Sequence, residues 1–505
     1  HRYRVRRRSN PMLFTSTSFA FIFLPLVLAG FFSVARWSAP LAAAWLFMAS
    51  LAFYAYWSAP YVLLLLASIV VNYAIGRRIS TCIAGQRPGA RRTLVAGLVF
   101  NLGLLAYYKY ASFFVANISA ATGLPLDVGS IVLPIGISFF TFTQIAFLVD
   151  TYRHGTREYR FLHYGLFVTY FPHLIAGPVL HHAQMMPQFG RPATYRPRLA
   201  NLAAGLAIFG IGLVKKVALA DGVAPFADAV FDGVAAGQAP SPNEAWLGAL
   251  AYTYQLYFDF SGYSDMAIGL SLMLNVRLPW NFDSPYRSAS IAEFWRRWHM
   301  TLSRFLREYL YVPLGGNRRG ELSRYGNLMA TMLLGGLWHG ANWTFVLWGG
   351  LHGLYLCANH AFRQAARRLR WKVRPSRAWA AAAWLTTFLC VVVAWVFFRA
   401  TSVEAAWTIV TAMAGVVLPG TLSTERLVMN AGLSPTYGAL ACAALGLIAV
   451  LRPNSNLIGC RLRRSCRQRP QAAAAMLGAS SVLSAFLVLL NAEREGANAF
   501  LYFNF

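Results

Sequence analysis

Apolar runs of about twenty residues recur along this chain and limit the folds that are open to it. Of its 505 residues, 57% are hydrophobic and only 12% are charged, whereas a soluble protein carries about 25% charged residues. A backbone inside lipid must satisfy its hydrogen bonds internally, so such runs predict membrane helices. The sequence therefore predicts an all-α polytopic membrane protein, with apolar runs near 13–34, 41–57, 60–76, 93–116, 131–149, 200–220, 245–276, 379–398, 404–418, 436–452 and 472–491.

The net charge of +28 has two possible meanings. In a soluble protein it would suggest a nucleic-acid partner. Here the arginines gather in short loops between apolar runs, such as 77–92, 153–160 and 452–469. Positive loops face the cytoplasm in membrane proteins. We therefore expect membrane lipids, and no nucleic acid, to surround this chain, and we expect these loops on the cytoplasmic side.

The amino terminus conflicts with this rule. Residues 1–11 carry five arginines before Met12, and three predicted spans between them and loop 77–92 would place them outside. Either one early segment is re-entrant or the basic lead is not native, and we prefer the second interpretation. No repeat or linker divides the remainder, so residues 12–505 are expected to form a single integral membrane domain.

Two apolar segments begin and end at basic loops, so we expect them to enter the membrane and return. One is 163–180, which contains His173 and Pro178; the other is 326–360. With these two segments the count of membrane segments is roughly eleven to thirteen. Irregular backbone at membrane depth persists only where protein covers it or where it lines a cavity. Segment 163–180 is therefore a candidate wall of a substrate cavity.

His339 lies in the middle of an uncharged stretch, because no Asp, Glu, Lys or Arg occurs between Arg324 and Arg363. It follows Trp338 and precedes Asn342. An ionisable residue inside the membrane marks a functional site by default, and a neutral imidazole suits a general base. The alternative is a structural histidine that is hydrogen-bonded in the core. Residue patterns alone leave both open.

A second histidine, His299, falls on the apolar side of a predicted amphipathic helix over 294–311, with Ser303 at the edge of that side and Trp298 within it. It either takes part in the chemistry or anchors the helix among lipid headgroups. The opposite side could contact an anionic donor or carrier, or simply headgroups; its arginines are Arg296, Arg297, Arg304 and Arg307.

We expect the other polar residues to have no role in catalysis or metal binding. Asp259 and Asp265 lie six residues apart, so they do not share a helix face and are not expected to act as a carboxylate pair. Lys215 and Lys216 are expected to extend toward the membrane surface. Adjacent His181 and His182 and the scattered cysteines do not have the spacing of a metal site, so we expect no metal. Nucleotide-binding, zinc-protease and serine-hydrolase motifs are missing.

Several motifs together resemble the membrane-bound O-acyltransferase (MBOAT) family in its bacterial AlgI/DltB-like branch. They keep the family's order over most of the chain. They are LPIGISFFTF at 133–142, FPHLIAGP at 171–178, YFDFSGYSDMA at 257–267, NFDSPY at 281–286, EFWRRWHMTLS at 293–303 and LWHG at 337–340.

The resemblance implies a ring of helices with a thin centre, where two funnels meet at a central tunnel. His339 matches the catalytic histidine and His299 the second family histidine. Tentative substrate-binding residues are Trp338, Asn342, Ser303, Trp298, Asp265, Tyr263, Pro178 and His173. Arg296, Arg297, Arg304 and Arg307 are tentative contacts for the donor or its carrier.

The resemblance also implies a function: transfer of an acyl group, most simply acetyl, across the bacterial inner membrane to an exopolysaccharide such as alginate or cellulose. The donor would be acetyl-CoA or a cytoplasmic acyl carrier, with no tightly bound cofactor. Expected partners are a periplasmic acetyltransferase or relay protein and a polysaccharide synthase. The alternative is a transporter or export scaffold for a glycan or lipid, with the acids and histidines as a path. Transporters usually show two related halves, and the sequence shows none.

Overall fold

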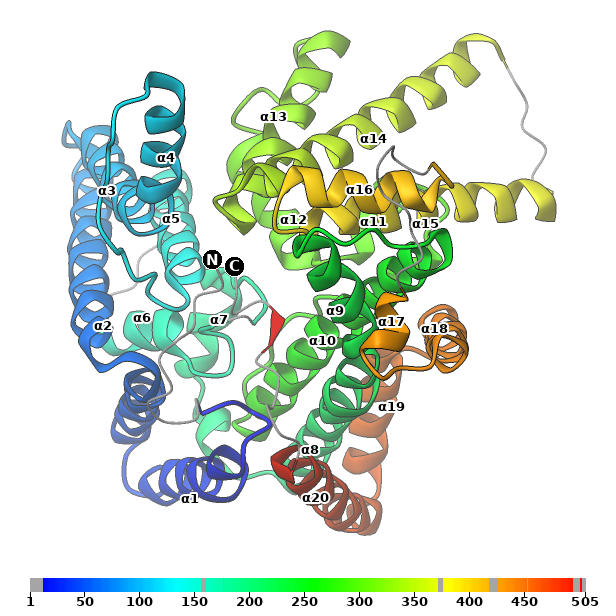
Figure 1. Cartoon of the computed structure of the whole chain (residues 1–505). Coiled ribbons are helices and arrows are strands. Elements are labelled where there is room, and N and C mark those ends of the chain that lie inside the picture. The colour runs from blue at the N-terminus through cyan, green and yellow to red at the C-terminus, as the bar shows by residue number, and fades with distance from the viewer. Residues whose placement is uncertain are drawn as a thin grey trace. The chain divides into compact units, whose positions relative to one another are not determined.

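The computed structural model describes residues 12–155, 160–175, 177–370, 376–416, 426–451, 453–493 and 500–501, and it contains helices but no strand within these ranges. The expected basic lead 1–11 lies outside the described residues. The α-helices (Figure 1) are α1 Leu24–Val34, α2 Ala39–Ala84, α3 Ala90–Leu105, α4 Ala111–Thr122, α5 Ile137–His154, α6 Phe161–Thr169, α7 His182–Phe189, α8 Leu199–Leu213, α9 Asp221–Ala235, α10 Pro242–Met273, α11 Ile291–Arg297, α12 Met300–Leu306, α13 Glu321–His339, α14 Trp343–Arg368, α15 Arg377–Arg399, α16 Val403–Met413, α17 Leu427–Asn430, α18 Pro435–Val450, α19 Ser455–Gln468 and α20 Pro470–Glu493.

Six short helices of other types complete the set. Four are π-helical segments that continue or precede α-helices, and two are 3₁₀ turns. They are η1 Ser18–Phe23, η2 Ala106–Tyr110, η3 Pro192–Tyr195, η4 Val214–Ala220, η5 Pro285–Arg287 and η6 Arg307–Tyr311.

Six described helices are long and apolar enough to cross a membrane, or seven if the bent pair α18–α19 is counted as one span. This finding supports the predicted polytopic membrane protein. The predicted count of roughly eleven to thirteen segments is larger, because it included short and broken apolar helices such as α1, α6 and α16. The six helices are Ala39–Trp57, Ala59–Ala84, Ala90–Thr122, Leu199–Ala235, Arg377–Arg399 and Pro470–Glu493.

The described residues group into two compact units. Within the described ranges, the first takes its residues from 12–213, 263–279, 459–493 and 500–501, and the second from 214–262 and 280–458. Both units are made of segments that are far apart in the sequence. The prediction of one integral domain over 12–505 stays a prediction.

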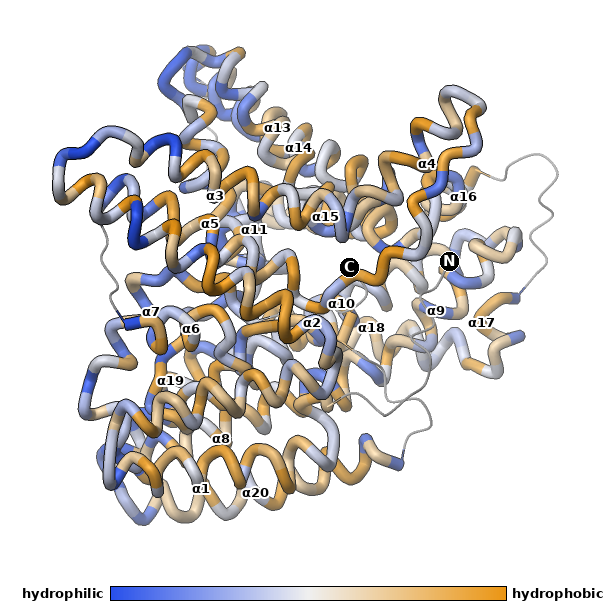
Figure 2. The backbone as a smooth tube through the Cα atoms, turned by 90° about the vertical axis from the view of Figure 1, so that its left-hand side faces the viewer, coloured by the Kyte–Doolittle hydropathy of each residue, from blue (hydrophilic) through white to orange (hydrophobic). Residues whose placement is uncertain are grey.

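In the first unit, apolar helices pack along their lengths. Helices α8 and α20 lie side by side, and both are largely apolar (Figure 2). Helices α2 and α3 also pack together, and the buried amides of Asn72 and Asn101 donate to each other over 3.2 and 2.6 Å. A reciprocal amide pair satisfies polar groups that would otherwise be costly to bury.

In the second unit, residues 221–244 carry four acids and no lysine or arginine, yet most of this segment is helical. Residues Asp221–Ala235 form α9, which continues from α8 through the π-helical η4. The four acids gave the segment a loop-like composition, but its apolar residues recur at helical spacing. Its buried face includes Val223, Phe226, Val230 and Val234.

Lys216, predicted to extend toward the membrane surface, is instead buried. Its ammonium group lies 2.8 Å from both Asp221 and Asp259. Both Lys216 and Asp259 are at most 2% exposed. Two carboxylates around one ammonium compensate a charge that could not be buried alone. The π-helical turn places Lys216 between them, whereas the sequence alone showed only a lysine pair.

Candidate active site

His339 is the last residue of α13 and lies beside the turn that joins α13 to α14. The chain therefore turns back directly after His339, as expected of a segment that enters the membrane and returns. The side chain is buried, with 4% exposed. Aromatic rings surround the imidazole: their centroids lie 4.9 Å away for Trp338, 5.0 Å for Trp348 and 5.2 Å for Phe398.

Two glycines let the α13–α14 hairpin close tightly around this site. A Cβ atom on Gly336 would lie 2.2 Å from the carbonyl oxygen of Phe345, and one on Gly349 would lie 2.3 Å from that of Met332. Real side chains never approach a backbone atom so closely. The hairpin therefore requires glycine at both positions, and this close contact fixes His339 relative to the rings of α14.

His299 is fully buried, but the helix predicted over 294–311 breaks at this residue. Helix α11 ends at Arg297, α12 begins at Met300, and His299 has φ 43° and ψ 54°. The prediction of one continuous helix was wrong. The amphipathic pattern of residues 294–311 continues through the break, so this pattern could not reveal where the helix ends.

Asn281 explains the break. Its side-chain oxygen lies 3.1 Å from Nδ1 of His299 and accepts hydrogen bonds from the backbone N–H and the hydroxyl of Thr301, over 3.3 and 2.9 Å. Its backbone oxygen accepts from the N–H of Met300 over 2.9 Å. Asn281 thus satisfies the amides at the start of α12 that a continuous helix would satisfy internally.

Burial lowers the pKa of His299 to about 3. The residue lies outside the six candidate membrane spans. Because desolvation disfavours the imidazolium, the ring is neutral at ordinary pH. Its Nδ1 faces the oxygen of Asn281, so Nδ1 carries the proton and Nε2 has its lone pair. A neutral histidine in this tautomer can accept a proton or a hydrogen bond through Nε2.

A row of contacting rings connects the two histidine regions. The ring of His339 touches Trp348; Trp348 stacks on Trp395 at 5.7 Å; and Trp395 contacts Trp298 at 4.9 Å. Trp298 precedes His299 in the chain. The structure therefore brings Trp298, Trp338 and both histidines into one aromatic cluster of the second unit.

The sequence reasoning missed two polar groups of this cluster. His352 is fully buried and accepts a hydrogen bond at Nδ1 from Trp295 over 3.3 Å. Its Nε2 and the indole N–H of Trp348 have no hydrogen-bond partner among the described residues. Buried polar atoms without partners need an explanation. In the sequence, Trp348 and His352 are four residues apart, and this spacing could have indicated that they share one face of a helix.

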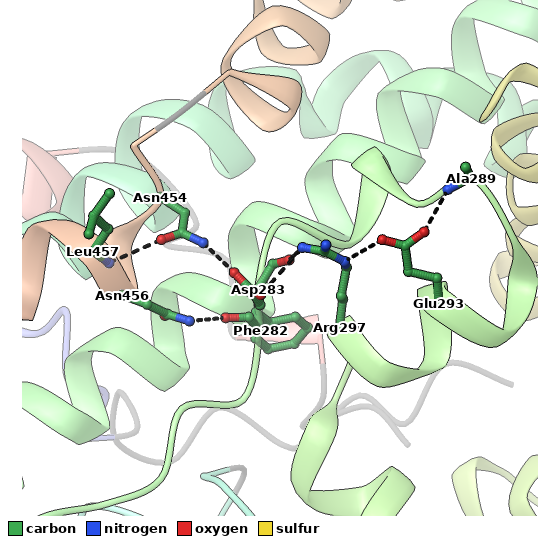
Figure 3. Close-up of polar contacts among 8 residues, drawn as sticks. All are labelled: Phe282, Asp283, Ala289, Glu293, Arg297, Asn454, Asn456 and Leu457. Carbon is green, nitrogen blue, oxygen red and sulfur yellow. Dashed lines mark hydrogen bonds and ion pairs between the residues drawn. The ribbon is translucent and has the colours of Figure 1, made fainter. Parts of the chain in front are cut away.

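Arg297 differs from the other arginines of the predicted donor face. Its guanidinium bonds the carboxylates of Asp283 and Glu293 over 3.3 and 3.0 Å. Asn454 donates to the other oxygen of Asp283 over 2.6 Å, and Asn456 donates to the carbonyl of Phe282 over 2.7 Å (Figure 3). The network fixes the segment that carries Asn281. Arg297 therefore has a structural role in this arrangement.

The remaining predicted residues of the second unit lie on α11, α12 and η6 or at the start of α14. Asn342 caps α14 through the N–H of Thr344 and donates to the carbonyl of Thr401 over 3.1 Å. The hydroxyl of Ser303 donates to the carbonyl of Trp298 over 3.3 Å. Three of the arginines predicted to contact the acyl donor are exposed, namely Arg296, Arg304 and Arg307. Of these, Arg304 pairs with Glu308.

Four predicted substrate residues belong to the first unit, and the structure does not place them relative to the histidine cluster. His173 is buried and donates from Nε2 to the carbonyl of Phe167 over 3.0 Å. Tyr263 packs against Phe14, with ring centroids 5.0 Å apart. Pro178 and Asp265 are buried.

One three-residue cluster could in principle hold a metal ion, which the adjacent histidines alone did not predict. Single ligand atoms of Asp150, His181 and His182 all lie within 4.8 Å of one another. However, Nδ1 of His181 accepts from the N–H of Ala183 at the start of α7, so Nε2 carries the proton and points it at Asp150, 2.7 Å away. This tautomer suits a hydrogen bond rather than a metal ligand.

Comparison with known proteins decides the family. A family model described as MBOAT, membrane-bound O-acyltransferase family, matches residues 122–400. A peptidoglycan O-acetyltransferase of Helicobacter pylori is 44% identical over 433 residues, which cover 80% of this chain and 80% of that protein. This chain belongs to the membrane-bound O-acyltransferase family. Within it, a probable alginate O-acetylase AlgI of Azotobacter vinelandii is 48% identical over 410 residues, covering 80% of this acyltransferase and 78% of the relative.

A more distant relative shows the breadth of the branch. A teichoic acid D-alanyltransferase of Streptococcus thermophilus is 27% identical over 237 residues, covering 45% of this chain and 57% of that protein. The AlgI/DltB-like resemblance is confirmed, and so is the assignment as a multi-pass membrane acyltransferase that takes an acyl donor as substrate. The matched region 122–400 includes the whole histidine cluster. These findings favour acyl transfer over the transporter alternative.

Proposed function

We propose that this acyltransferase moves an acetyl group from a cytoplasmic thioester donor, acetyl-CoA or an acyl carrier, for O-acetylation of an exopolysaccharide outside the bacterial inner membrane. The observation that carries the proposal is the coincidence of two facts. The family match spans residues 122–400, and the two histidines that match the family's histidines, His299 and His339, lie in one aromatic cluster of that region. Relatives named for alginate and peptidoglycan O-acetylation support acetyl as the group and a glycan hydroxyl as the acceptor.

His339 acts as the general base in this proposal. It takes the proton of the acceptor hydroxyl, which belongs to the glycan or to a relay protein, as that oxygen attacks the thioester carbonyl. The C–S bond then breaks, and the thiolate leaves with the proton that His339 received. Rings around His339 exclude water, which would otherwise hydrolyse the donor.

Trp348 supplies a hydrogen bond in the same proposal. Its ring contacts the imidazole of His339, and its N–H lacks a partner among the described residues. A buried donor beside the base can stabilise the oxygen that gains charge when the carbonyl is attacked. His299, neutral and held by Asn281, orients the donor or accepts a hydrogen bond from it through Nε2. Contacts with substrate at Trp338, Asn342, Ser303 and Trp298 belong to the same proposal.

The test is acetyl transfer in membrane vesicles. Radiolabelled acetyl-CoA would be supplied on the cytoplasmic face, and label in extravesicular polymer would be counted. His339→Ala should abolish transfer above background at equal expression. His360→Gln is the matched control, because His360 lies on α14 of the same hairpin, beside Arg324 and far along the helix from His352. Transfer that persists in His339→Ala contradicts the mechanism.

In this proposal the acceptor polymer lies outside the inner membrane, so partner proteins must bring it to the acetyl group. A polymer synthase presents the acceptor, and a periplasmic acetyltransferase or relay protein receives the acetyl group where the glycan itself does not reach the site. Membranes that contain this chain alone should then acetylate a small acceptor alcohol but not the polymer. Adding the partner should restore polymer labelling, which scintillation counting of precipitated polymer would measure.

A further inference from the structure

Five arginines gather in the first unit without any acid among them. Arg277 follows α10, Arg463 and Arg467 lie one turn apart on α19, and Arg191 and Arg198 flank η3. The electrical fields of Arg467, Arg191 and Arg198 act on Arg277, and those of Arg277, Arg467 and Arg198 act on Arg463. Within the part of the chain that the structure describes, no carboxylate appears among the groups acting on either residue.

The arginines lack partners as well as counter-charges. None of the five makes an ion pair within the part of the chain that the structure describes. The Nε atom of Arg463 is buried and has no hydrogen-bond partner there. A buried guanidinium N–H without an acceptor is unfavourable, and like charges at short range repel each other. Both features are removed at once if an anion binds.

Hydrogen bonds fix the backbone of the two segments that carry Arg277, Arg191 and Arg198. The side chain of Gln188 donates to the carbonyl of Arg277 over 2.9 Å and accepts from its N–H over 2.8 Å. Asn275, in a left-handed conformation with φ 61°, donates to the carbonyls of Thr194 and Arg196 over 3.0 and 2.8 Å. The loop that carries Arg277 is thereby fixed to the segment that carries Arg191 and Arg198. A fixed site loses less entropy on binding than a mobile one.

Partial burial, followed by the fields of Arg467, Arg191 and Arg198, lowers the pKa of Arg277. Arginine still stays protonated in proteins, so the repulsion cannot be relieved by losing a proton. A bound anion is the remaining way to relieve it. The loops involved are also ones that the charge pattern predicts on the cytoplasmic side, where phosphorylated donors and anionic headgroups are found.

We propose that Arg191, Arg198, Arg277, Arg463 and Arg467 form a binding site for a phosphate-bearing anion. Planar guanidinium groups pair with phosphate oxygens through two parallel hydrogen bonds, and several around one anion can hold a doubly charged phosphate or pyrophosphate. Two sources carry this chemistry: the phosphates of a soluble donor and the headgroup of an anionic lipid. The site does not depend on the proposed acetyl chemistry or on His339.

The test uses the purified full chain in phosphate-free detergent. Inorganic pyrophosphate, or adenosine 3′,5′-bisphosphate, is titrated at constant ionic strength while thermal unfolding is followed by tryptophan fluorescence. An anion that binds the folded state raises the unfolding temperature. The variant Arg277→Gln/Arg463→Gln should bind at least about tenfold more weakly, since a hydrogen bond to a charged group contributes about 1.5–3 kcal/mol.

The matched control is Arg461→Gln/Arg464→Gln on the same helix. It removes the same charge, but these residues lie about 160° and about 100° around α19 from Arg463. The control should bind pyrophosphate as the unaltered chain does. Without anion, the cluster variant should unfold at the same or a higher temperature, because repulsion is removed. An arginine cluster with a purely structural role would instead lower that temperature.

A second arm separates the two sources. The same chains are placed in nanodiscs of phosphatidylcholine alone or with phosphatidylglycerol. Stabilisation by phosphatidylglycerol that requires the cluster identifies a lipid headgroup; stabilisation by the soluble anions alone identifies a soluble phosphate. If the cluster variant fails to fold, Arg277→Lys/Arg463→Lys keeps the charge and should weaken binding by removing the paired hydrogen bonds.

The site is refuted if neither anion nor lipid stabilises the unaltered chain, or if the cluster variant responds as the control does. The His339→Ala variant should retain anion binding. Loss of acetyl transfer with intact anion binding would therefore concern the proposed base alone, and loss of anion binding with intact folding would concern this site alone.

Discussion

His299 and His339 are both buried in the same unit, yet their surroundings differ. Asn281 holds Nδ1 of His299 at a backbone break, whereas His339 ends a regular helix and packs against the rings of Trp338, Trp348 and Phe398. A hydrogen bond to a fixed amide settles one tautomer and one orientation. The rings exclude water from the imidazole of His339. We therefore propose proton transfer for His339 and positioning for His299.

Replacing His339 should have the largest effect. His339→Ala removes the base, so the acetyl-transfer rate should fall by about 10²–10⁴-fold. Because the ring contributes little to donor binding in this comparison, KM for the donor should change much less than kcat. Steady-state kinetics in vesicles would measure both. A large rise in KM with kcat retained would assign His339 to binding and reverse the two roles.

Trp348→Phe separates the ring from its N–H. Phenylalanine keeps an aromatic face beside His339 and removes the donor, so kcat should fall by about 10²-fold if the N–H stabilises the developing charge. Trp395→Phe is the comparison variant, since Trp395 stacks on Trp348 one ring further from His339. Equal losses in the two variants would mean that packing, and not the hydrogen bond, matters at this position.

His299→Gly tests positioning without disturbing the backbone. Glycine adopts the left-handed conformation freely, so this variant should be about 1 kcal/mol more stable than His299→Ala. Both should lose activity by roughly ten- to a hundredfold, because a misplaced reactant reacts slowly. Thermal unfolding and initial rates would be compared. Full activity in His299→Gly would leave His299 only a structural role.

The stability of the fold should depend on pH through His299. Its folded pKa is about 3 and its ordinary value is 6.5, so the unfolded chain binds the proton first as the pH falls. Stability contributed by the neutral ring is complete above pH ~6.5 and should decrease by about 1.4 kcal/mol per pH unit toward pH ~3. His299→Gly should lose this part of the slope in unfolding curves at pH 7.5, 6 and 5. An unchanged slope would show that His299 does not titrate in this way.

The arginines beside His299 should show the smallest effects. Arg297→Gln breaks the pairs with Asp283 and Glu293 and should cost about 1 kcal/mol of stability, because the pairs are partly exposed. Arg296→Gln should leave stability unchanged and, if this face meets the donor, raise only KM for the donor. Unfolding temperature and donor KM, measured together, separate the two residues. If Arg297→Gln and Arg296→Gln were equally stable, the ion pairs of Arg297 would not stabilise the segment that holds His299.

Sequence patterns predicted the α13–α14 hairpin and the place of His339 because that stretch has no charged residue and begins and ends at arginines. They failed at His299, where the contact with Asn281, eighteen residues away, overrides helical periodicity. They also failed at Lys216, whose partner Asp259 is 43 residues distant in the chain. In both cases, a hydrogen bond or ion pair to a residue far away in the chain decided the local structure. Periodicity and helix propensity report only on neighbouring residues and could not predict it.

The sequence by itself determined that this is a membrane protein and that it belongs to an acyltransferase family. Apolar runs and ordered motifs can be read along the chain without knowing its fold. Only the tertiary structure decided which polar groups are compensated. Within the described residues, Lys216 pairs with two carboxylates, Arg297 pairs with two, and the arginines around Arg463 pair with none. Charge compensation depends on distances between segments far apart in the chain, and those distances exist only after folding.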